Sequence, residues 1–516
     1  MHRLLSVCVL AFCLSGCETL NTKHGWLPSV LNDDAPYLQQ LSRSKAAASP
    51  KDTNGAKDAD DGKDVRMMQS TGLGLVYHPE LEQLLNAELQ RIRDTSGFTQ
   101  VPGRVYIMAS PTMNALTTAD GNIYIPMGML MDIQSMDELD ALLAHEFAHT
   151  VLAHTDSDLL KVIQKKGTAA YAVVNRLGMN AGNAEQVNRR IRNGVALYMA
   201  TEKIISPTWN RKQEGDADKL AVDLLVKAGR NLNGMTALLS RVDQWDKINA
   251  GLRENDKPKQ SMLVAAATSQ LAQNEWQALL MQALDPVGRQ IEDGIAQAGN
   301  THFGPQERLE DINAYVRTHY RKAARPTVDD KSWRKTAHSQ KSKRLAQGVV
   351  QSHLAYRSVS QNNGTIARKA LAKAKHRDLA GQTFYQLALA MLADDGRKTT
   401  EVMSVAQSAL GNPYPSYRLQ IMAQQAKALQ QGKTDGEELK ALYEEFDRYG
   451  RPVEFYYDLI RLAEASDNKG LKLELVIRCQ VDYFGDAAAC SSTDNQAAAK
   501  QDPGIVNGFL GLFGKK

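Results

Sequence analysis

Apolar residues recur at intervals of three and four in one stretch of the chain and alternate with polar ones in two stretches that follow. The segment 79–97, PELEQLLNAELQRIRDTSG, has the helical spacing and predicts an amphipathic helix. The segments RVYIMAS (104–110) and NIYIPMGML (122–130) favour strands, and the turn-rich NALTTADGN between them favours a connection. The pattern predicts a helix followed by two strands.

A second helix is indicated directly after these strands. Ser135 and Glu138 give a capping-box signature in front of an apolar-periodic run, so we expect this helix to begin near Met136. Two strands that lead into a long helix indicate an α+β unit with a small sheet beside the helix. Beyond about residue 342 almost every segment is helix-forming. We therefore expect a mainly α protein, in which an α+β domain precedes an α-helical domain.

The C-terminal region repeats a pattern of an Ala/Leu-rich helix followed by a polar stop. The stops lie near Gly396, Gly432 and Gly470, which are 36 and 38 residues apart. This spacing is close to the roughly 34-residue period of tetratricopeptide repeats. We predict tetratricopeptide-like helical repeats over 346–495, with a plain helical bundle as the alternative, and a tail over 496–516.

Length and charge restrict the possible classes of function. A chain of 516 residues is too long for one ordinary core and predicts two or three domains. Lys and Arg number 62 against 58 Asp and Glu, a formal net charge of +4, which argues against a dedicated nucleic-acid-binding protein. No stretch after residue 20 approaches the roughly 20 apolar residues that a membrane-spanning helix needs.

The N-terminus has a basic start, an apolar run and then Leu14-Ser15-Gly16-Cys17. This pattern resembles the lipobox of bacterial lipoproteins, in which residues 1–16 are the signal peptide and Cys17 receives a diacylglycerol. Glu18 in place of aspartate resembles lipoproteins sent to the outer membrane. We expect a periplasmic protein anchored by lipid to the inner leaflet of the outer membrane. An ordinary signal peptide is the alternative.

Two segments read as connections, and the cysteines fit an oxidising compartment. Residues 17–69 contain a stretch almost free of large apolar side chains, which predicts a flexible tether. The strongly basic residues 326–345 predict an exposed linker between domains. With Cys17 acylated and the signal cysteines removed, Cys479 and Cys490 are left and are expected to form a disulfide.

The predicted helix after Met136 contains the chain's strongest chemical signal, His145-Glu146-Phe147-Ala148-His149. Two histidines four residues apart project from one face of a helix and can bind one zinc ion. Glu146 lies beside His145 near that metal, where it can act as general base toward an attacking water. The motif therefore predicts a metal-dependent hydrolase rather than a core helix with buried histidines.

A third ligand is expected from outside this helix. Metzincin spacing is excluded, because Leu152 and Thr155 stand where that class has glycine and histidine. His154 lies about 140° around the helix from His149, so a supporting or packing role is expected for it. The segment NRKQEGDADKLAVDLL predicts a second helix with Glu214 and Asp218 on one face.

These two acids have distinct expected roles. Glu214 is the candidate third ligand, and Asp218 is placed to accept a hydrogen bond from a ligand histidine. The alternative is that both acids face solvent on an exposed helix, as most acidic side chains do.

Together, HEFAH, the E-x-x-A-D of 214–218 and the segment THFGPQERLEDI resemble the M48 family of zinc metallopeptidases. The resemblance covers about 70–325 and implies a zincin fold, one zinc ion per chain and endopeptidase activity. His302 and Arg308 match the family's Thr-His-Pro-type loop, although Phe303 and Gly304 precede the proline. His302 is expected to stabilise the oxyanion or to occupy the open metal position at rest, and capping the following helix is the alternative.

The resemblance also implies where substrate binds. The segment that matches the family's substrate-pairing strand includes Asn122, Ile123, Tyr124 and Ile125. An extended peptide held mainly by backbone hydrogen bonds would be unfolded or stalled rather than folded.

An exported M48 domain followed by helical repeats is similar to periplasmic β-barrel assembly-enhancing proteases. This similarity implies quality control of envelope proteins, with unfolded or stalled envelope polypeptides as substrates. The repeats would bind clients or the outer-membrane assembly machinery. The alternative is an adaptor lipoprotein whose proteolysis stays latent.

Overall fold

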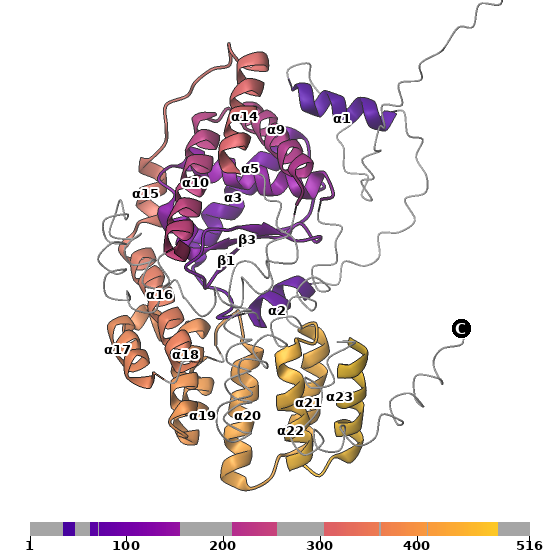
Figure 1. Cartoon of the computed structure of the whole chain (residues 1–516), viewed down its shortest axis with the longest axis vertical. Coiled ribbons are helices and arrows are strands. Elements are labelled where there is room, and N and C mark those ends of the chain that lie inside the picture. Colours follow the sequence, from indigo (N-terminus) through magenta and orange to yellow (C-terminus); the bar gives the residue numbers. More distant parts are fainter. Residues whose placement is uncertain are drawn as a thin grey trace, which may run out of the picture.

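The structure is a computed structural model, which describes residues 35–46, 62–70, 72–154, 209–254, 304–360, 363–409 and 411–482. The signal peptide with Cys17, the candidate residue His302, Cys490 and the C-terminal tail lie outside the described residues, and they stay predictions. None of the described helices is both long and apolar enough to cross a bilayer. The described chain is mainly helical with one small sheet, which confirms the predicted fold class (Figure 1).

The sheet of the first domain has three strands, β1 (Val105–Met108), β2 (Leu116–Thr117) and β3 (Ile123–Pro126). Their order is β1-β3-β2, with β3 parallel to β1 and antiparallel to β2. On the other side of β1 the chain at Gly74 accepts a hydrogen bond of 2.8 Å from the amide of Ala109. Strand β2 is thus the outer strand at one end of the sheet.

This topology corrects the predicted substrate-pairing strand. The prediction placed it at Asn122 to Ile125, but β3 lies in the centre of the sheet and pairs on both sides. The segment after Pro126 also differs from the expected strand, because Met127–Asp132 form the short helix α4. The edge strand lies in the segment that the sequence favoured as a turn-rich connection.

Helix α5 (Met136–Val151) crosses the centre of this domain, and all of its residues are buried. Ser135 caps it by accepting a hydrogen bond of 3.2 Å from the amide of Glu138, which confirms the predicted start. The surrounding helices are α3 (Pro79–Ser96), α9 (Arg211–Lys227), α10 (Asn233–Glu254) and α14 (Pro305–His319). Of these, α3, α9 and α10 contact α5 directly.

Part of the predicted tether is folded. Helix α1 (Pro36–Ala46) packs on α9, and the amides of Tyr37 and Leu38 donate to the buried Oδ2 of Asp223 over 2.9 and 3.1 Å. Helix α2 (Lys63–Ser70) buries Met67 and Met68 in the protein core. The tether prediction is wrong for these two helices, because short apolar stretches within a polar segment find buried partners in the body of the protein.

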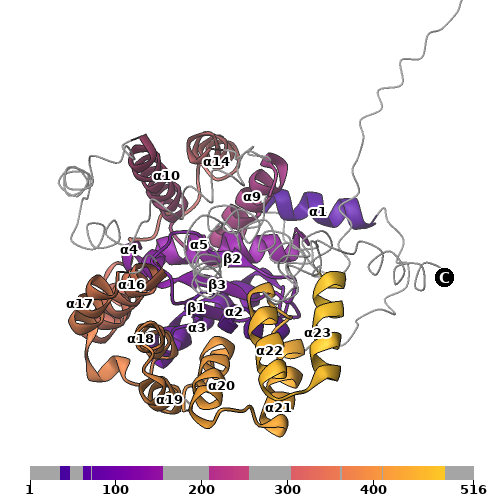
Figure 2. The same cartoon turned by 60° about the horizontal axis from the view of Figure 1, so that its bottom comes forward.

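The C-terminal region is an array of helices that pack in sequence order and curve around the domain (Figure 2). Its elements are α16 (Gln340–Ser360), α17 (Gly364–Ala374), η1 (Arg377–Leu379), α18 (Thr383–Asp395), α19 (Thr399–Ser408), α20 (Tyr417–Gln431), α21 (Gly436–Arg448), α22 (Val453–Ala465) and α23 (Lys469–Asp482). An array of this kind agrees with the predicted helical domain, and its assignment to tetratricopeptide repeats stays a prediction. Cys479 in α23 is buried and disulfide-bonded, with its partner outside the described residues.

The predicted basic linker is also structured. Residues Lys331–Ala337 form helix α15, and its Trp333 is fully buried. The indole Nε1 of Trp333 donates a hydrogen bond of 2.7 Å to the backbone oxygen of Ile133, the residue that caps the end of α4. The linker prediction is wrong here because the charged residues lie on the outer side of a helix whose tryptophan anchors it to the domain.

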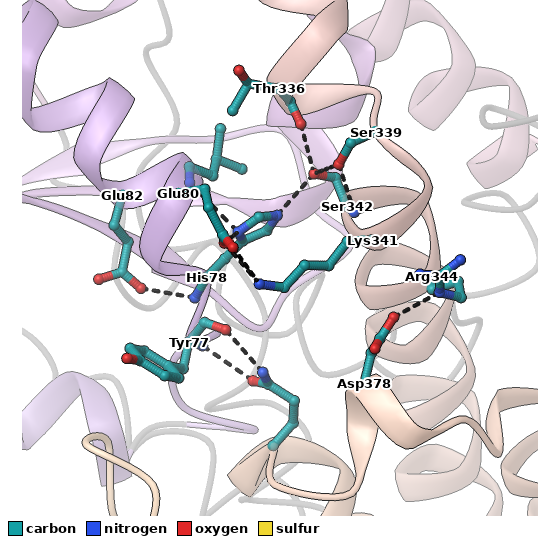
Figure 3. A network of polar contacts seen from close by, with 12 residues as sticks. Tyr77, His78, Glu80, Glu82, Thr336, Ser339, Lys341, Ser342, Arg344 and Asp378 are labelled. Atoms are coloured by element: carbon teal, nitrogen blue, oxygen red, sulfur yellow. Dashed lines mark hydrogen bonds and ion pairs between the residues drawn. The ribbon is translucent and has the colours of Figure 1, made fainter.

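A polar network joins the start of α3 to the array (Figure 3). The buried His78 contacts Ser342 Oγ through its Nε2 over 2.8 Å, and Ser342 Oγ donates to the backbone oxygen of Thr336 over 2.9 Å. Next to this contact, Lys341 Nζ lies 2.7 Å from Oε2 of Glu80. The two regions are therefore joined by a buried polar contact and an exposed ion pair as well as by apolar packing.

Candidate metal centre

Helix α5 places His145 and His149 one turn apart on the same face. Their Nε2 atoms face each other at 3.1 Å, and both side chains are buried. The second helix, α9, begins with a capping box between Asn210 and Gln213, and this start sets Glu214 in its first turn. Oε2 of Glu214 lies 3.6 Å from Nε2 of His145.

The structure thus brings together the three predicted ligands His145, His149 and Glu214. One possible ligand atom from each lies within 4.8 Å of the others. Two imidazole nitrogens and one carboxylate oxygen are a donor set that zinc accepts in catalytic sites. The residues therefore fit a divalent metal ion.

The outer nitrogen of each histidine is held by another side chain. Nδ1 of His145 lies 2.9 Å from Oδ1 of Asp218, the contact expected of Asp218 from the sequence. Nδ1 of His149 lies 2.9 Å from Nδ1 of His154. In each ring Nδ1 is engaged and Nε2 is directed inward, an arrangement typical of metal-binding histidines. His154 accordingly supports a ligand.

Trp209 stacks on the ring of His149. The two ring centroids are 3.4 Å apart and the planes are inclined by only 12°. Trp209 lies directly before the cap residue of α9, so the same chain segment that positions Glu214 also covers His149. Stacking fixes the plane of the imidazole and limits the directions from which water reaches it.

Arg308, which the resemblance singled out, reaches the site from α14. Its guanidinium makes two hydrogen bonds to the carboxylate of Asp218, of 2.9 and 2.7 Å. Nη1 also lies 2.9 Å from Oε2 of Glu214. Arg308 therefore neutralises the buried Asp218 and the partly buried Glu214. The oxygen of Glu214 that it contacts is the one that faces Nε2 of His145.

The electrostatics follow from burial and from this ion-pair network. Burial alone would raise the pKa of Asp218, but Arg308 and then His145 hold the pKa of that carboxyl at about 2. Burial opposes protonation of His145 most strongly, yet the hydrogen bond to Asp218 together with the charges of Asp218 and Glu214 raises the pKa of His145. For His149, burial followed by the nearby His145 lowers the pKa well below its ordinary value. His149 is therefore neutral, as metal binding requires.

Glu146 lies on the same helix and is held by the edge strand. The hydroxyl of Thr117 donates a hydrogen bond of 2.8 Å to Oε2 of Glu146. Burial raises the pKa of Glu146, while His145 and then Thr117 oppose the rise. A buried carboxylate with a raised pKa is suited to accept and return a proton near neutral pH.

Sequence reasoning missed Thr117 and Trp209. No motif marks either of them, because Thr117 acts through the fold of a two-residue strand and Trp209 through stacking. Only their positions in the sequence could have indicated them. Thr117 lies in the connection between the predicted strands, and Trp209 lies directly before the predicted second helix.

Comparison with known proteins agrees with this site. Residues 79–319 match the model of peptidase family M48. The zebrafish mitochondrial metalloendopeptidase OMA1 is 25% identical over 180 residues, which are 33% of this chain and 35% of that protein. The metalloprotease YcaL of Escherichia coli is 26% identical over 246 residues, 47% of this chain and 86% of YcaL.

A third relative matches this chain over about a third of its own length. The β-barrel assembly-enhancing protease of Yersinia pestis is 24% identical over 183 residues, 34% of this chain and 36% of that protein. This chain therefore spans about a third of the length of the zebrafish and Yersinia relatives. Residues 79–319, which match the family model, contain both the histidine pair of α5 and the acids of α9. Residues 79–319, which contain the candidate metal centre, thus match peptidase family M48.

Proposed function

We propose that this protein is a zinc-dependent endopeptidase that cleaves unfolded or stalled polypeptides of the bacterial envelope. The observation that carries the proposal is the convergence of Nε2 of His145, Nε2 of His149 and the carboxylate of Glu214 beside the buried Glu146. This set contains three protein ligands and a general base, which are the parts that a hydrolytic zinc site needs.

Each residue has a defined task in peptide hydrolysis. His145, His149 and Glu214 would hold the metal. A bound zinc ion supplies Lewis acidity, which polarises the scissile carbonyl and makes an attacking water more acidic. Glu146 accepts the proton of that water and later donates it to the leaving amine. Thr117 keeps the carboxylate of Glu146 oriented through its hydrogen bond of 2.8 Å.

Substrate binding is assigned to β2 in place of β3. Among the described residues β2 pairs with β3 alone, so its other edge is the side on which an extended peptide would add a strand. Thr117 in β2 contacts Glu146 directly, which sets a peptide paired with this strand beside the general base. Backbone pairing of this kind requires an extended chain and favours unfolded substrates over folded ones.

The envelope setting is supported by the sequence and by the names of relatives. The N-terminal lipobox-like pattern supports export and a lipid anchor at Cys17, and the Yersinia relative is named a β-barrel assembly-enhancing protease. The helical array is proposed to bind clients or the outer-membrane assembly machinery. The inner leaflet of the outer membrane is the proposed location.

The decisive experiment compares the wild-type protein with Glu146→Gln. Purified full-length protein is depleted of metal, loaded with zinc and assayed on an unfolded protein substrate. We expect Glu146→Gln to retain one zinc per chain and to lose activity by a factor of about 10² to 10⁴, the contribution of a general base. Glu307→Gln, an exposed acid on α14 whose side chain is 57% accessible, is the matched control and should remain active.

Two results would overturn the proposal. Undiminished proteolysis in Glu146→Gln would exclude Glu146 as general base. Wild-type protein that holds zinc yet cleaves no unfolded substrate would favour the adaptor alternative, in which deletion of the array harms envelope assembly more than Glu146→Gln does.

A further inference from the structure

Helix α2 lies between the sheet of the peptidase domain and the helical array (Figure 1). Its Met67 and Met68 belong to an apolar cluster that includes Leu116 of β2 and Phe446 of α21. On its exposed side, Nε of Arg66 donates a hydrogen bond of 3.2 Å to the backbone oxygen of Arg448. One short helix therefore contacts both regions of the protein.

The polar contacts of α2 converge on Asp64, a carboxylate that is only 8% exposed. Its Oδ2 accepts three side-chain hydrogen bonds, from Thr118 Oγ1 at 2.6 Å, Asn122 Nδ2 at 2.8 Å and Tyr124 OH at 3.0 Å. Its Oδ1 accepts from the amide of Val65 over 2.7 Å. Both carboxylate oxygens of Asp64 thus accept hydrogen bonds, and three of these four hydrogen bonds come from residues of the β2–β3 segment.

The three partners on the sheet belong to the hairpin that joins β2 to β3 (residues 116–126). Thr118 and Asn122 close its turn, since the amide of Thr118 donates to the backbone oxygen of Asn122 over 3.0 Å. Oδ1 of Asn122 also accepts from the amide of Arg104 at the start of β1, over 2.8 Å. Asp64 therefore fixes both ends of the turn and, through Tyr124, the central strand.

This hairpin includes the strand to which the proposed function assigns substrate, and our inference rests on that assignment. Thr118 follows directly after Thr117, whose hydroxyl binds Glu146. We propose that Asp64 is a positioning residue for peptide hydrolysis, and that α2 couples the packing of the helical array to the geometry of the β2–β3 hairpin. Changes at the array then reach the substrate-binding edge through α2.

A purely local structural role for Asp64 would have a different contact pattern. An aspartate that only begins a helix accepts from amides of its own helix, as Asp435 does with the amides of Glu437 and Glu438 in front of α21. Asp64 instead directs Oδ2 entirely at residues 54 to 60 positions away in the sequence. The buried charge of Asp64 is thus stabilised mainly by donors of the hairpin.

The first test measures hydrogen–deuterium exchange and kinetics on the full-length, zinc-loaded protein. In Asp64→Ala we expect exchange at residues 114–122 to rise about tenfold, the size expected for loss of charge-assisted hydrogen bonds. KM for an unfolded substrate should rise by a similar factor, with kcat and zinc content changed much less. Asp64→Asn keeps an acceptor for the two hydroxyl donors and should fall between Asp64→Ala and the wild type.

Asn363→Ala is the matched control, because it removes a cap residue in front of α17, an array helix that packs against α16 and α18. Its exchange at 114–122 should match that of the wild type. If Asp64→Ala leaves this exchange unchanged, or if Asn363→Ala raises it equally, the positioning role is refuted. Exchange needs no catalysis, so this result stands even if the proposed endopeptidase activity fails its own test.

The second test examines the coupling through two equivalent leucines of the array. Leu442 lies in α21, which packs on α2, whereas Leu387 lies in α18, which packs on α16, α17, α19 and α20. Leu442→Ala should raise exchange at the hairpin, and Leu387→Ala should not. Equal effects of the two substitutions on the hairpin, or no effect of Leu442→Ala, would overturn the coupling.

Discussion

Thr117 donates a hydrogen bond of 2.8 Å to Oε2 of Glu146, and so joins the strand at the edge of the sheet to the helix of the metal centre. Both residues are buried, with exposed fractions of 2% and 4%. The proposed general base and the proposed substrate-binding strand are therefore held in a fixed relative position by a direct hydrogen bond. A peptide paired with β2 would lie at a fixed distance from the carboxylate of Glu146.

Thr117→Val removes this donor and leaves a side chain of similar shape. A hydrogen bond to a charged group contributes about 1.5–3 kcal/mol, so we expect kcat to fall by about tenfold or more. The same bond lowers the pKa of Glu146 against the effect of burial. Its loss raises that pKa further, and because the base must be ionised, the acidic limb of the kcat profile should move to higher pH.

Thr117→Ser keeps a hydroxyl at this position and serves as the control. It should retain most of the activity and the wild-type acidic limb. The comparison is made from kcat measured across pH with zinc content determined for each variant. An acidic limb in Thr117→Val that coincides with that of the wild type would show that this hydrogen bond does not tune Glu146.

His154→Ala tests the support of His149. Nδ1 of His154 lies 2.9 Å from Nδ1 of His149, and burial lowers the pKa of His154 to about 4, so the pair is neutral. Loss of an outer partner of a metal-binding histidine costs about 10- to 100-fold in metal affinity. We expect a loss of this size in a zinc competition assay. His376→Ala, a partly exposed histidine in the array, should bind zinc like the wild type.

Arg308→Ala tests whether a metal and the guanidinium share the task of neutralising the site. Asp218 and Glu214 are both within 2.9 Å of Arg308, whose side chain is 13% exposed. Removing one partner of a buried pair costs about 3–5 kcal/mol. Because a bound cation replaces part of the lost charge, we expect the melting temperature to fall more in metal-free than in zinc-loaded protein.

Arg317→Ala, an exposed arginine on the same helix, is the control for this comparison. It should change the melting temperature of the two forms little and equally. Equal destabilisation of metal-free and zinc-loaded Arg308→Ala would show that Arg308 and the metal act independently.

The ligand set could be predicted from the sequence because helical spacing is local information. His145 and His149 share a face at a separation of four residues, and Glu214 and Asp218 do so for the same reason. The start of α5 could also be predicted, since a capping serine accepts a hydrogen bond from the amide three residues later. These features need no knowledge of the rest of the fold.

The edge strand could not be predicted from the sequence in the same way. Leu116 and Thr117 are too short a segment to show strand periodicity, and which strand lies outermost depends on pairing across the whole sheet. Helices α1 and α15 were missed for a related reason. Asp223 caps α1 from 186 residues away, and Trp333 anchors α15 to Ile133 across 200 residues. Contacts at that separation leave no local signal.

The contact between His78 and Ser342, which joins the start of α3 to the array, predicts that the stability of the protein depends on pH. Burial, and then the nearby Lys341, lowers the pKa of His78 below its ordinary value, and the opposing effect of Glu80 is smaller. The unfolded chain therefore binds a proton at this histidine more readily than the folded chain does. Stability must then rise with pH through this range, and it must fall as the pH drops below the ordinary pKa of about 6.5.

We expect the melting temperature of the full-length protein to be lower at pH 5.5 than at pH 7.5, by an amount that shrinks in His78→Gln. Glutamine keeps polar contact with Ser342 but does not titrate, so its variant loses the proton-linked part of the change. His319→Gln, an exposed histidine at the end of α14, controls for removal of a histidine as such and should retain the wild-type difference. If the melting temperature of His78→Gln falls between the two pH values by as much as that of the wild type, protonation of His78 is not the origin of the acid sensitivity.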